Sequence, residues 1–320
     1  MQPLKLTPAF KDYLWGGTRL RTDFRFETEL SPVAEAWVLS CHRDGHSVIA
    51  EGTDAGMTLA DWIVREGRGV LGKNAAALPD FPILIKLIDA EKPLSLQVHP
   101  DDAYARANGE GYGKTELWYV LDAAPGATLY YGLTRDVSRE ELAARITDNS
   151  LLSVVNAVPV KAGDCFYVKA GTIHGIGAGI LIAEIQQSSN ATYRVYDYGR
   201  LGADGKPRPL HLQQALDVLT TTAVDPAGMA RPVFTEREGY ATARLARNDY
   251  FTIDALRIAV SATLTAGEES FHALLCTAGA GTLRWGEQSL TYKKGDALFL
   301  PAGLGKYTLF GECEMLLTHV

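Results

Sequence analysis

One twelve-residue motif occurs twice in this chain. Residues 163–174 read GDCFYVKAGTIH and residues 295–306 read GDALFLPAGLGK, so both copies share an initial Gly-Asp, a central Ala-Gly and a final basic position. Each copy follows a turn-rich pair of predicted strands. We interpret the repeat as two related β-barrels, one ending near residue 235 and one over roughly 240–320. Residues 221–236, rich in turn formers, are the predicted connector.

Short apolar runs separated by glycine and proline make up much of the rest of the sequence. Many short strands with frequent turns are typical of a sandwich or barrel. The strand-like segments are 81–88, 94–99, 117–121, 128–131, 164–168 and 180–185. Segments with helix-start residues or one apolar face predict helices at 58–66, 101–108, 138–147 and 211–219. The expected fold is therefore mainly β with helical insertions.

Composition excludes several classes of protein. The chain is 47% hydrophobic and 22% charged, which is globular rather than disordered. Its net charge of −7 argues against a nucleic-acid partner, which needs a basic face. No apolar stretch long enough for a membrane span occurs, no secretory leader is evident, and no obligate protein partner is indicated. The four scattered cysteines predict reduced thiols in a cytoplasmic protein.

The segment LSLQVH, residues 94–99, alternates strictly between apolar and polar side chains. Successive side chains of a strand point to opposite faces, so Ser95, Gln97 and His99 share one face. A solvent-exposed strand face would give the same pattern. The alternation alone therefore leaves both a polar site and an exposed surface open.

Two further segments favour the polar site. Glu116 lies in the strand-like KTELWYVL, and His174 ends the first copy of the repeated motif. Two imidazoles and one carboxylate, from His99, Glu116 and His174, are a typical metal-ligand set, and Gln97 is a candidate fourth ligand. The other histidines have no comparable context and are expected to be structural: His42, His46, His211, His272 and His319.

Charged residues near these segments suggest an anionic substrate. Lys86 and Glu184 each lie within an apolar run, where a charge is paired or functional, although Lys86 on an edge strand could also reach water. Lys114 lies two residues before a candidate ligand, and Arg194 alternates with Thr192 and Tyr196 on a strand-like segment that Arg200 follows. Together these cations would give local positive potential in an acidic protein.

The motifs together resemble a known family. The pattern GD…AGTIH resembles the cupin superfamily, and LSLQVHPDD, GKTELWYV, GTIHGIG and NATYRVYDYGR together resemble the short bacterial type I mannose-6-phosphate isomerases (phosphomannose isomerases). Trp15-Gly16-Gly17 and residues 34–37 also match, so the resemblance spans roughly residues 5–220. Ordinary cupins place their glutamate soon after a His-x-His pair, whereas here 16 residues separate His99 from Glu116.

The resemblance implies a site as well as a fold. It implies one zinc ion per chain, with four ligands: His99, Glu116, His174 and Gln97. It also matches residues for catalysis (Arg194, Lys114 and Glu184) and for substrate binding (Ser95, Arg200 and Lys86). The implied fold is two cupin-like jelly-roll barrels, a catalytic domain over residues 1–236 and a metal-free domain over residues 237–320.

The implied reaction interconverts D-mannose 6-phosphate and D-fructose 6-phosphate by moving a proton between C2 and C1 through an enediol. Lys114, Glu184 and a metal-bound water remain open as the base. A cupin oxygenase with iron in the same ligand set, and a non-catalytic sugar-binding cupin, are the alternatives. The basic cluster and Gln97 argue against the oxygenase, and no DNA-binding element supports a regulator.

The second copy of the motif predicts a structural barrel. It ends in Lys306 where the first copy ends in His174, and a protonated ammonium has no lone pair for a metal. The alternative is a degenerate second site formed by His272 with Glu268 or Glu269.

Overall fold

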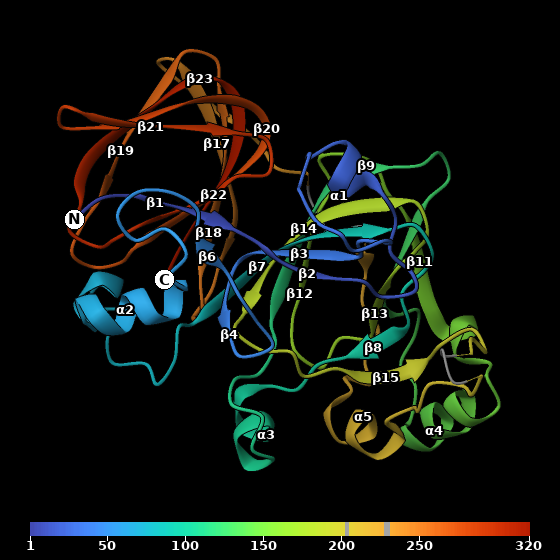
Figure 1. The fold of residues 1–320 in the computed structure, drawn as a ribbon. Coiled ribbons are helices and arrows are strands. Elements are labelled where there is room, and N and C mark those ends of the chain that lie inside the picture. The colour runs from blue at the N-terminus through green and yellow to red at the C-terminus, as the bar shows by residue number, and fades with distance from the viewer. Residues whose placement is uncertain (202–204, 227–230) are drawn as a thin grey trace. The chain divides into compact units, whose positions relative to one another are not determined.

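The computed structural model describes residues 1–201, 205–226 and 231–320, which form two compact units. Unit 1 contains Met1–Asp12, Thr18–Leu87 and Pro232–Val320, and unit 2 contains Tyr13–Gly17 and Ile88–Arg231. Strands predominate in both units, which confirms the mainly β fold (Figure 1). The domain boundary between residues 236 and 237 stays a prediction.

Unit 1 has strands from both ends of the chain. Its N-terminal elements are β1 (Leu4–Thr7), β2 (Ala9–Lys11), α1 (Arg19–Thr22), β3 (Glu35–Leu39), β4 (Cys41–His42), β5 (Gly45–His46), β6 (Val48–Ile49), α2 (Leu59–Glu66) and the short 3₁₀ helix η1 (Arg68–Leu71). Its C-terminal elements are β16 (Thr235–Arg237), β17 (Tyr240–Arg247), β18 (Thr252–Ile258), β19 (Ser261–Ala266), β20 (His272–Trp285), β21 (Gln288–Lys293), β22 (Ala297–Leu300) and β23 (Gly305–His319). Strand β7 (Ile83–Ala90) continues from unit 1 into unit 2.

A ten-stranded sheet organises unit 1, in the order β16-β17-β18-β23-β20-β22-β1-β6, with β19 on β23 and β21 on β20. The second copy of the repeated motif forms β22 and leads into β23. The core of these C-terminal strands is apolar and contains leucines, alanines, two buried cysteines and the rings of Tyr292 and Tyr307.

Unit 2 contains most of the residues singled out in the sequence. Its elements are β8 (Leu96–Val98), α3 (Asp102–Ala107), β9 (Glu116–Ala123), β10 (Thr128–Leu133), α4 (Arg139–Thr147), the 3₁₀ helix η2 (Leu151–Val154), β11 (Val155–Pro159), β12 (Cys165–Val168), β13 (His174–Ile176), β14 (Ile180–Gln187), β15 (Tyr193–Tyr196) and α5 (Leu212–Val218). The predicted strands and helices are therefore confirmed, with boundaries that differ by a few residues.

Two groups of hydrogen-bonded strands position the site in unit 2. One is a five-stranded sheet in the order β11-β10-β13-β8-β15, and the other contains β12, β9 and β14 as neighbours. The apolar face of β8 packs into a core with α4 and α5, where Leu96 and Val98 are fully buried. The alternation seen in residues 94–99 thus puts Gln97 on the opposite face of the sheet.

Side-chain caps explain where three of the helices begin. Thr58, Asp101 and Ser138 each accept a hydrogen bond from the main-chain N–H three residues further on. Such caps satisfy one of the N–H groups that the first turn of a helix leaves without an internal partner. Capping therefore defines the starts of α2, α3 and α4.

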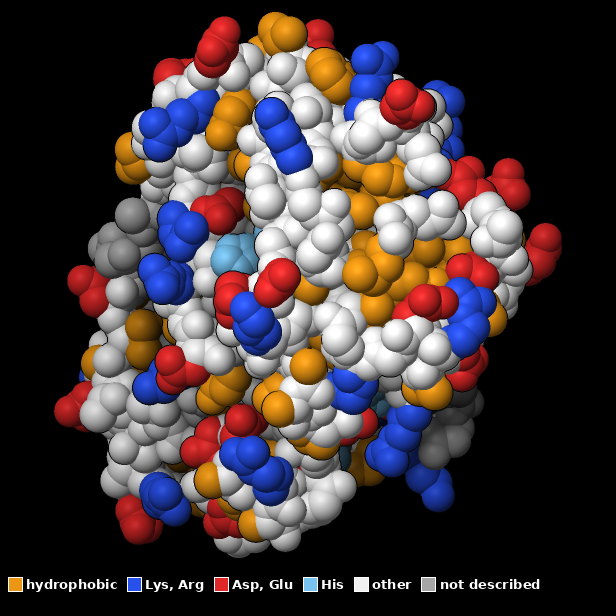
Figure 2. All heavy atoms as spheres, turned by 90° about the vertical axis from the view of Figure 1, so that its left-hand side faces the viewer, with side chains coloured by type: hydrophobic (Ala, Val, Ile, Leu, Met, Phe, Trp, Pro, Cys, Tyr) orange, Lys and Arg blue, Asp and Glu red, His pale blue; other side chains and the backbone are white. Residues whose placement is uncertain are grey.

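The distribution of surface charge and the state of the cysteines bear on the expectations drawn from the composition. On the face drawn in Figure 2, basic and acidic side chains are interspersed rather than gathered by sign. All four cysteines are free. Within the described ranges, no helix has the length and hydropathy needed to cross a membrane.

Candidate metal centre

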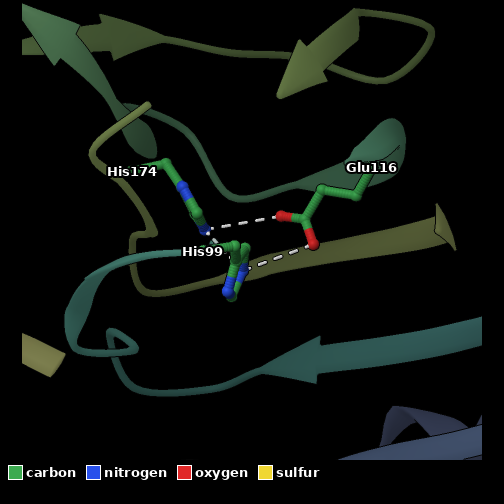
Figure 3. A group of neighbouring side chains, drawn as sticks. All are labelled: His99, Glu116 and His174. Carbon is green, nitrogen blue, oxygen red and sulfur yellow. Dashed lines mark hydrogen bonds and ion pairs between the residues drawn. The ribbon is translucent and has the colours of Figure 1, made fainter. Parts of the chain in front are cut away.

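His99, Glu116 and His174 converge in unit 2 from three separate segments (Figure 3). His99 follows directly on β8, Glu116 is the first residue of β9, and His174 is the first residue of β13. All three side chains are fully buried. In the part of the chain that the structure describes, this is the one group of three or more such residues with the spacing of metal ligands.

The main chain determines which nitrogen of each imidazole is protonated. Nδ1 of His99 lies 2.8 Å from the carbonyl oxygen of Ala191, and Nδ1 of His174 lies 2.8 Å from that of Thr172. A carbonyl oxygen only accepts, so both Nδ1 atoms carry the proton and both Nε2 atoms present a lone pair. These two Nε2 atoms are 3.1 Å apart and face the carboxylate of Glu116. Three electron-pair donors that converge in this way favour a cation between them, and the ammonium of Lys114, 3.0 Å from His99 Nε2, already contacts two of the three.

The distances between the ligand atoms fit such a cation. His99 Nε2 lies 3.5 Å from Glu116 Oε2, and His174 Nε2 lies 3.4 Å from Glu116 Oε1. Ligands bound about 2.1 Å from one tetrahedral ion are about 3.4 Å from each other. Burial lowers the pKa of His174 to about 3, so its imidazole stays neutral and able to bind a metal. These residues fit a tetrahedral metal such as zinc.

Strand pairing places Gln97 and Arg194 next to the ligands. His174 of β13 is directly opposite Gln97 of β8, and Gln97 is directly opposite Arg194 of β15. Residues opposite each other share a face, so the three side chains form a row across the sheet. Gln97 Nε2 is 3.4 Å from His174 Nε2, and rotation of the amide would bring its oxygen to the same place.

Lys114 and Glu184 form a buried charged pair beside the ligands. The ammonium of Lys114 lies 2.5 Å from Glu116 Oε2 and 3.7 Å from Glu184 Oε1. Glu184 also accepts a 2.9 Å hydrogen bond from Nε1 of Trp118, whose ring meets the imidazole of His174 edge-on at 5.2 Å. The pair therefore belongs to the same polar cluster as the candidate ligands, and its role in catalysis stays a prediction.

The turn before His174 holds both ligand histidines in place. The N–H of Gly171 donates to the carbonyl of His99 at 2.9 Å, and its own carbonyl accepts from the N–H of Thr220 at 2.8 Å. Gly171 has a φ of +86°, and a Cβ there would lie 2.8 Å from Thr220 Oγ1. Glycine is required at this position both for its conformation and for this close approach.

Arg200 is held by a carboxylate that it shares with a second arginine. Asp197, buried near the end of β15, accepts hydrogen bonds from Arg200 and from Nε and Nη2 of Arg208 at 2.7 and 2.6 Å. Burial raises the pKa of Asp197, but the hydrogen bonds from the two arginines outweigh it and leave the pKa below its usual range. With Arg194 nearby on the same strand, the region has a local excess of positive charge.

Two further predicted residues, Ser95 and Lys86, are both buried. Ser95 is buried directly before β8, two residues from Gln97. Lys86 belongs to unit 1, where it is 4% exposed, lies 3.7 Å from Glu35 and sits 5.0 Å from the ring centre of Trp37. It is thus a buried, paired lysine rather than an edge lysine in water, and its role near the substrate stays a prediction.

One detail of the sequence interpretation needs correction. Register shifts between Arg194 and Tyr196, so Tyr196 is buried in the apolar core instead of sharing the face of Arg194. His211, which the sequence predicted to be structural, accepts a hydrogen bond from the main-chain N–H of Arg194. No periodic pattern in the sequence indicates this contact, because His211 is there only the first residue of a predicted helix.

Comparisons with known proteins agree with this architecture. The model of the phosphomannose isomerase type I catalytic domain matches residues 3–149, and that of the mannose-6-phosphate isomerase cupin domain matches residues 241–320. The cupin match extends the resemblance to the C-terminal strands of unit 1.

Relatives match over the full chain. Mannose-6-phosphate isomerase of Streptococcus mutans is 37% identical, covering 99% of this chain and 98% of its own, and ManA of Bacillus subtilis is 36% identical, covering 100% and 99%. The crystal structure of mannose 6-phosphate isomerase from Bacillus subtilis superposes with a TM-score of 0.92 at 36% identity, with both chains fully covered. The chain therefore belongs to the type I mannose-6-phosphate isomerase, or phosphomannose isomerase, family.

Proposed function

We propose that this chain interconverts D-mannose 6-phosphate and D-fructose 6-phosphate, using one zinc ion per chain. The convergence of lone pairs from His99, Glu116 and His174 is the observation that supports the proposal most, because it makes a cation site within a chain of this family. The proton at C2 of the aldose moves to C1, and the hydroxyl proton at O2 moves to O1, through an enediol.

Zinc suits a ligand set of two imidazole nitrogens and one carboxylate, and the amide oxygen of Gln97 is the proposed fourth ligand. When bound, such an ion supplies positive charge that polarises the oxygens of the sugar and favours the enediolate. The carbonyls of Ala191 and Thr172 support this role, because they keep the ligand imidazoles oriented and in the required tautomer.

Lys114 and Glu184 are the proposed residues for proton transfer. They are buried and ion-paired with each other, next to the ligands. To move a proton between two neighbouring carbons, an enzyme needs a proton acceptor and a proton donor close together, and a low-dielectric cluster holds both. Trp118 keeps the carboxylate of Glu184 oriented through its indole N–H.

Arg194 is proposed to stabilise the negative charge that develops on the sugar oxygens. Its guanidinium remains protonated at any pH of interest, and its place in the row beside Gln97 supports this role. Its Nε has no hydrogen-bond partner among the described residues. Arg200, Ser95 and Lys86 are the proposed residues for the phosphate.

An assay that couples fructose 6-phosphate formation to a dehydrogenase tests the proposal directly. We expect turnover with mannose 6-phosphate, its loss on exhaustive chelation, and its recovery with added zinc. Oxygen uptake instead of isomerisation would indicate a cupin oxygenase, and binding without turnover would indicate a sugar-binding protein.

Elemental analysis after dialysis tests the metal. We expect close to one equivalent of zinc per chain, and a different metal or two equivalents would contradict the proposal. The proposed ligand is a small sugar phosphate, without a nucleic-acid, membrane or obligate protein partner. The proposed location is the cytoplasm, which the four free thiols support.

A further inference from the structure

His211 and Arg194 bond to each other through two hydrogen bonds in opposite directions. The main-chain N–H of Arg194 donates to Nδ1 of His211 at 3.1 Å, and the main-chain N–H of His211 donates to the carbonyl of Arg194 at 2.8 Å. Among the described residues β15 is the last strand of its sheet, so no described strand pairs with its outward main-chain groups. The imidazole of His211 thus accepts where a carbonyl of the next strand would accept.

The residues just before His211 hold the same strand at two more points. The carbonyl of Pro209 accepts from Nη1 of Arg194 at 3.1 Å, and the guanidinium of Arg208 forms two hydrogen bonds with Asp197. Residues 208–211 therefore bind both the main chain and the guanidinium of Arg194.

The electrostatics favour the form of His211 that can accept this bond. Burial and the nearby charge of Arg194 lower the pKa of His211, and the weaker effect of Glu110 opposes them. The neutral imidazole then keeps its lone pair on Nδ1 and its proton on Nε2. The ring also packs at 6.3 Å from the ring of Tyr193, whose hydroxyl donates to Glu110 at 2.6 Å.

We propose that His211 is a positioning residue for Arg194. By accepting from the N–H of Arg194, it fixes the outer edge of β15, so that the guanidinium keeps its place in the row with Gln97 and His174. The inference rests on the proposed role of Arg194 in the isomerase. Displacement of a catalytic group by about 1 Å can cost on the order of 100-fold in rate, so a lost edge contact is expected to be measurable.

Three variants separate the hydrogen bond from packing. In His211→Asn the amide oxygen lies near the place of Nδ1, in His211→Gln it lies about one bond further out, and His211→Phe keeps a ring without an acceptor. We expect kcat for mannose 6-phosphate to stay within about threefold for Asn and to fall roughly 10- to 100-fold for Gln and Phe, with KM changed little. Gln213→Ala, an exposed position on α5, is the control and should match the unmodified enzyme.

A second measurement distinguishes positioning from a general structural role. In an Arg194→Ala background, His211→Gln should cause little further loss, because the group that it positions is already absent. Thermal unfolding and zinc content, measured for each protein, identify any variant that fails to fold, and the Asn/Gln comparison stands without the Phe variant. Equal activity for Asn and Gln, or full additivity with Arg194→Ala, would overturn the inference. An unmodified enzyme without isomerase activity would instead refute the proposed function.

Discussion

The two copies of the repeated motif form the same turn but end in residues with different surroundings. In each copy the aspartate accepts a hydrogen bond from the main-chain N–H three residues earlier, Lys161 to Asp164 at 2.9 Å and Lys293 to Asp296 at 3.0 Å. The first copy leads into buried His174, whereas the second leads into exposed Lys306. The turn therefore has the same hydrogen bond in both units, and the two copies differ in the residue with which each one ends.

The polar groups around the second copy form pairwise hydrogen bonds and ion pairs, whereas those after the first copy point toward one shared place. Nδ1 of His272 lies 2.8 Å from the hydroxyl of Tyr307. Glu268 and Glu269, the candidate partners of His272 in a second metal site, form surface ion pairs with Lys73. That this barrel is structural and free of metal stays a prediction, and four experiments test the difference between the copies.

The largest expected difference is between His174→Ala and Lys306→Ala, the two equivalent positions. His174→Ala should lose the zinc and lower kcat on the order of 1000-fold or more, because it removes a ligand and the charge that the ion supplies. Lys306→Ala should retain both. Elemental analysis and the coupled assay check these outcomes, and a zinc-loaded, active His174→Ala protein would contradict the proposed site.

The next largest effect is expected at Arg194. Arg194→Ala should reduce kcat roughly 100- to 1000-fold, which is the usual cost of one lost donor to a developing oxyanion. Its midpoint of thermal unfolding should change little. Steady-state kinetics with calorimetry tests both parts, and a kcat within a few-fold of the unmodified enzyme would show that Arg194 has another role.

A smaller effect is expected at Arg200, and it should appear in KM. A charge-assisted hydrogen bond to a phosphate is worth about 1.5–3 kcal/mol, so Arg200→Ala should raise KM for mannose 6-phosphate about 10-fold or more. Any weak activity on free mannose should be nearly unchanged. If both sugars lost activity equally, Arg200 would not recognise the phosphate.

The smallest effect concerns stability and the second barrel. Burial, with a lesser contribution from His319, lowers the pKa of His272 from 6.5 to about 4. The unfolded chain then takes up a proton that the folded chain does not, so stability is complete above pH 6.5 and is lost as the pH falls towards 4. The loss is at most about 3 kcal/mol.

Urea unfolding at pH 7.5 and pH 5 measures this loss. His272→Phe, which cannot titrate, should lose less stability than the unmodified protein between the two pH values, and its activity at neutral pH should be retained. An identical pH dependence in both proteins would show that protonation of His272 does not cause the loss of stability.

Local signals in the sequence predicted much of the fold and brought together the three residues of the candidate metal centre. Strict alternation over residues 94–99 located one strand with its polar face, since an apolar core permits one register of a half-buried strand. Caps such as Thr58 located helix starts, because a capping bond is made within one turn of the chain. The candidate ligands were chosen because two imidazoles and one carboxylate are common metal ligands, and because the motifs around them resemble those of a known family.

Long-range main-chain contacts were beyond this kind of inference. His211 meets Arg194 at the last strand of the sheet as far as the chain is described, and which strand is last depends on the order of strands. Arg208 and Asp197 meet through the same segment. The register shift that buries Tyr196 likewise breaks the simple two-residue period on which the prediction for residues 192–196 relied.

The bonds between residues 208–211 and β15 have a consequence for solubility. The open side of a sheet is a template on which a second chain can add a strand, and this is a route to aggregation. At Arg194 both outward main-chain groups are already bonded to His211. We therefore expect the contact between His211 and Arg194 also to hinder the addition of a second chain at this edge of the sheet.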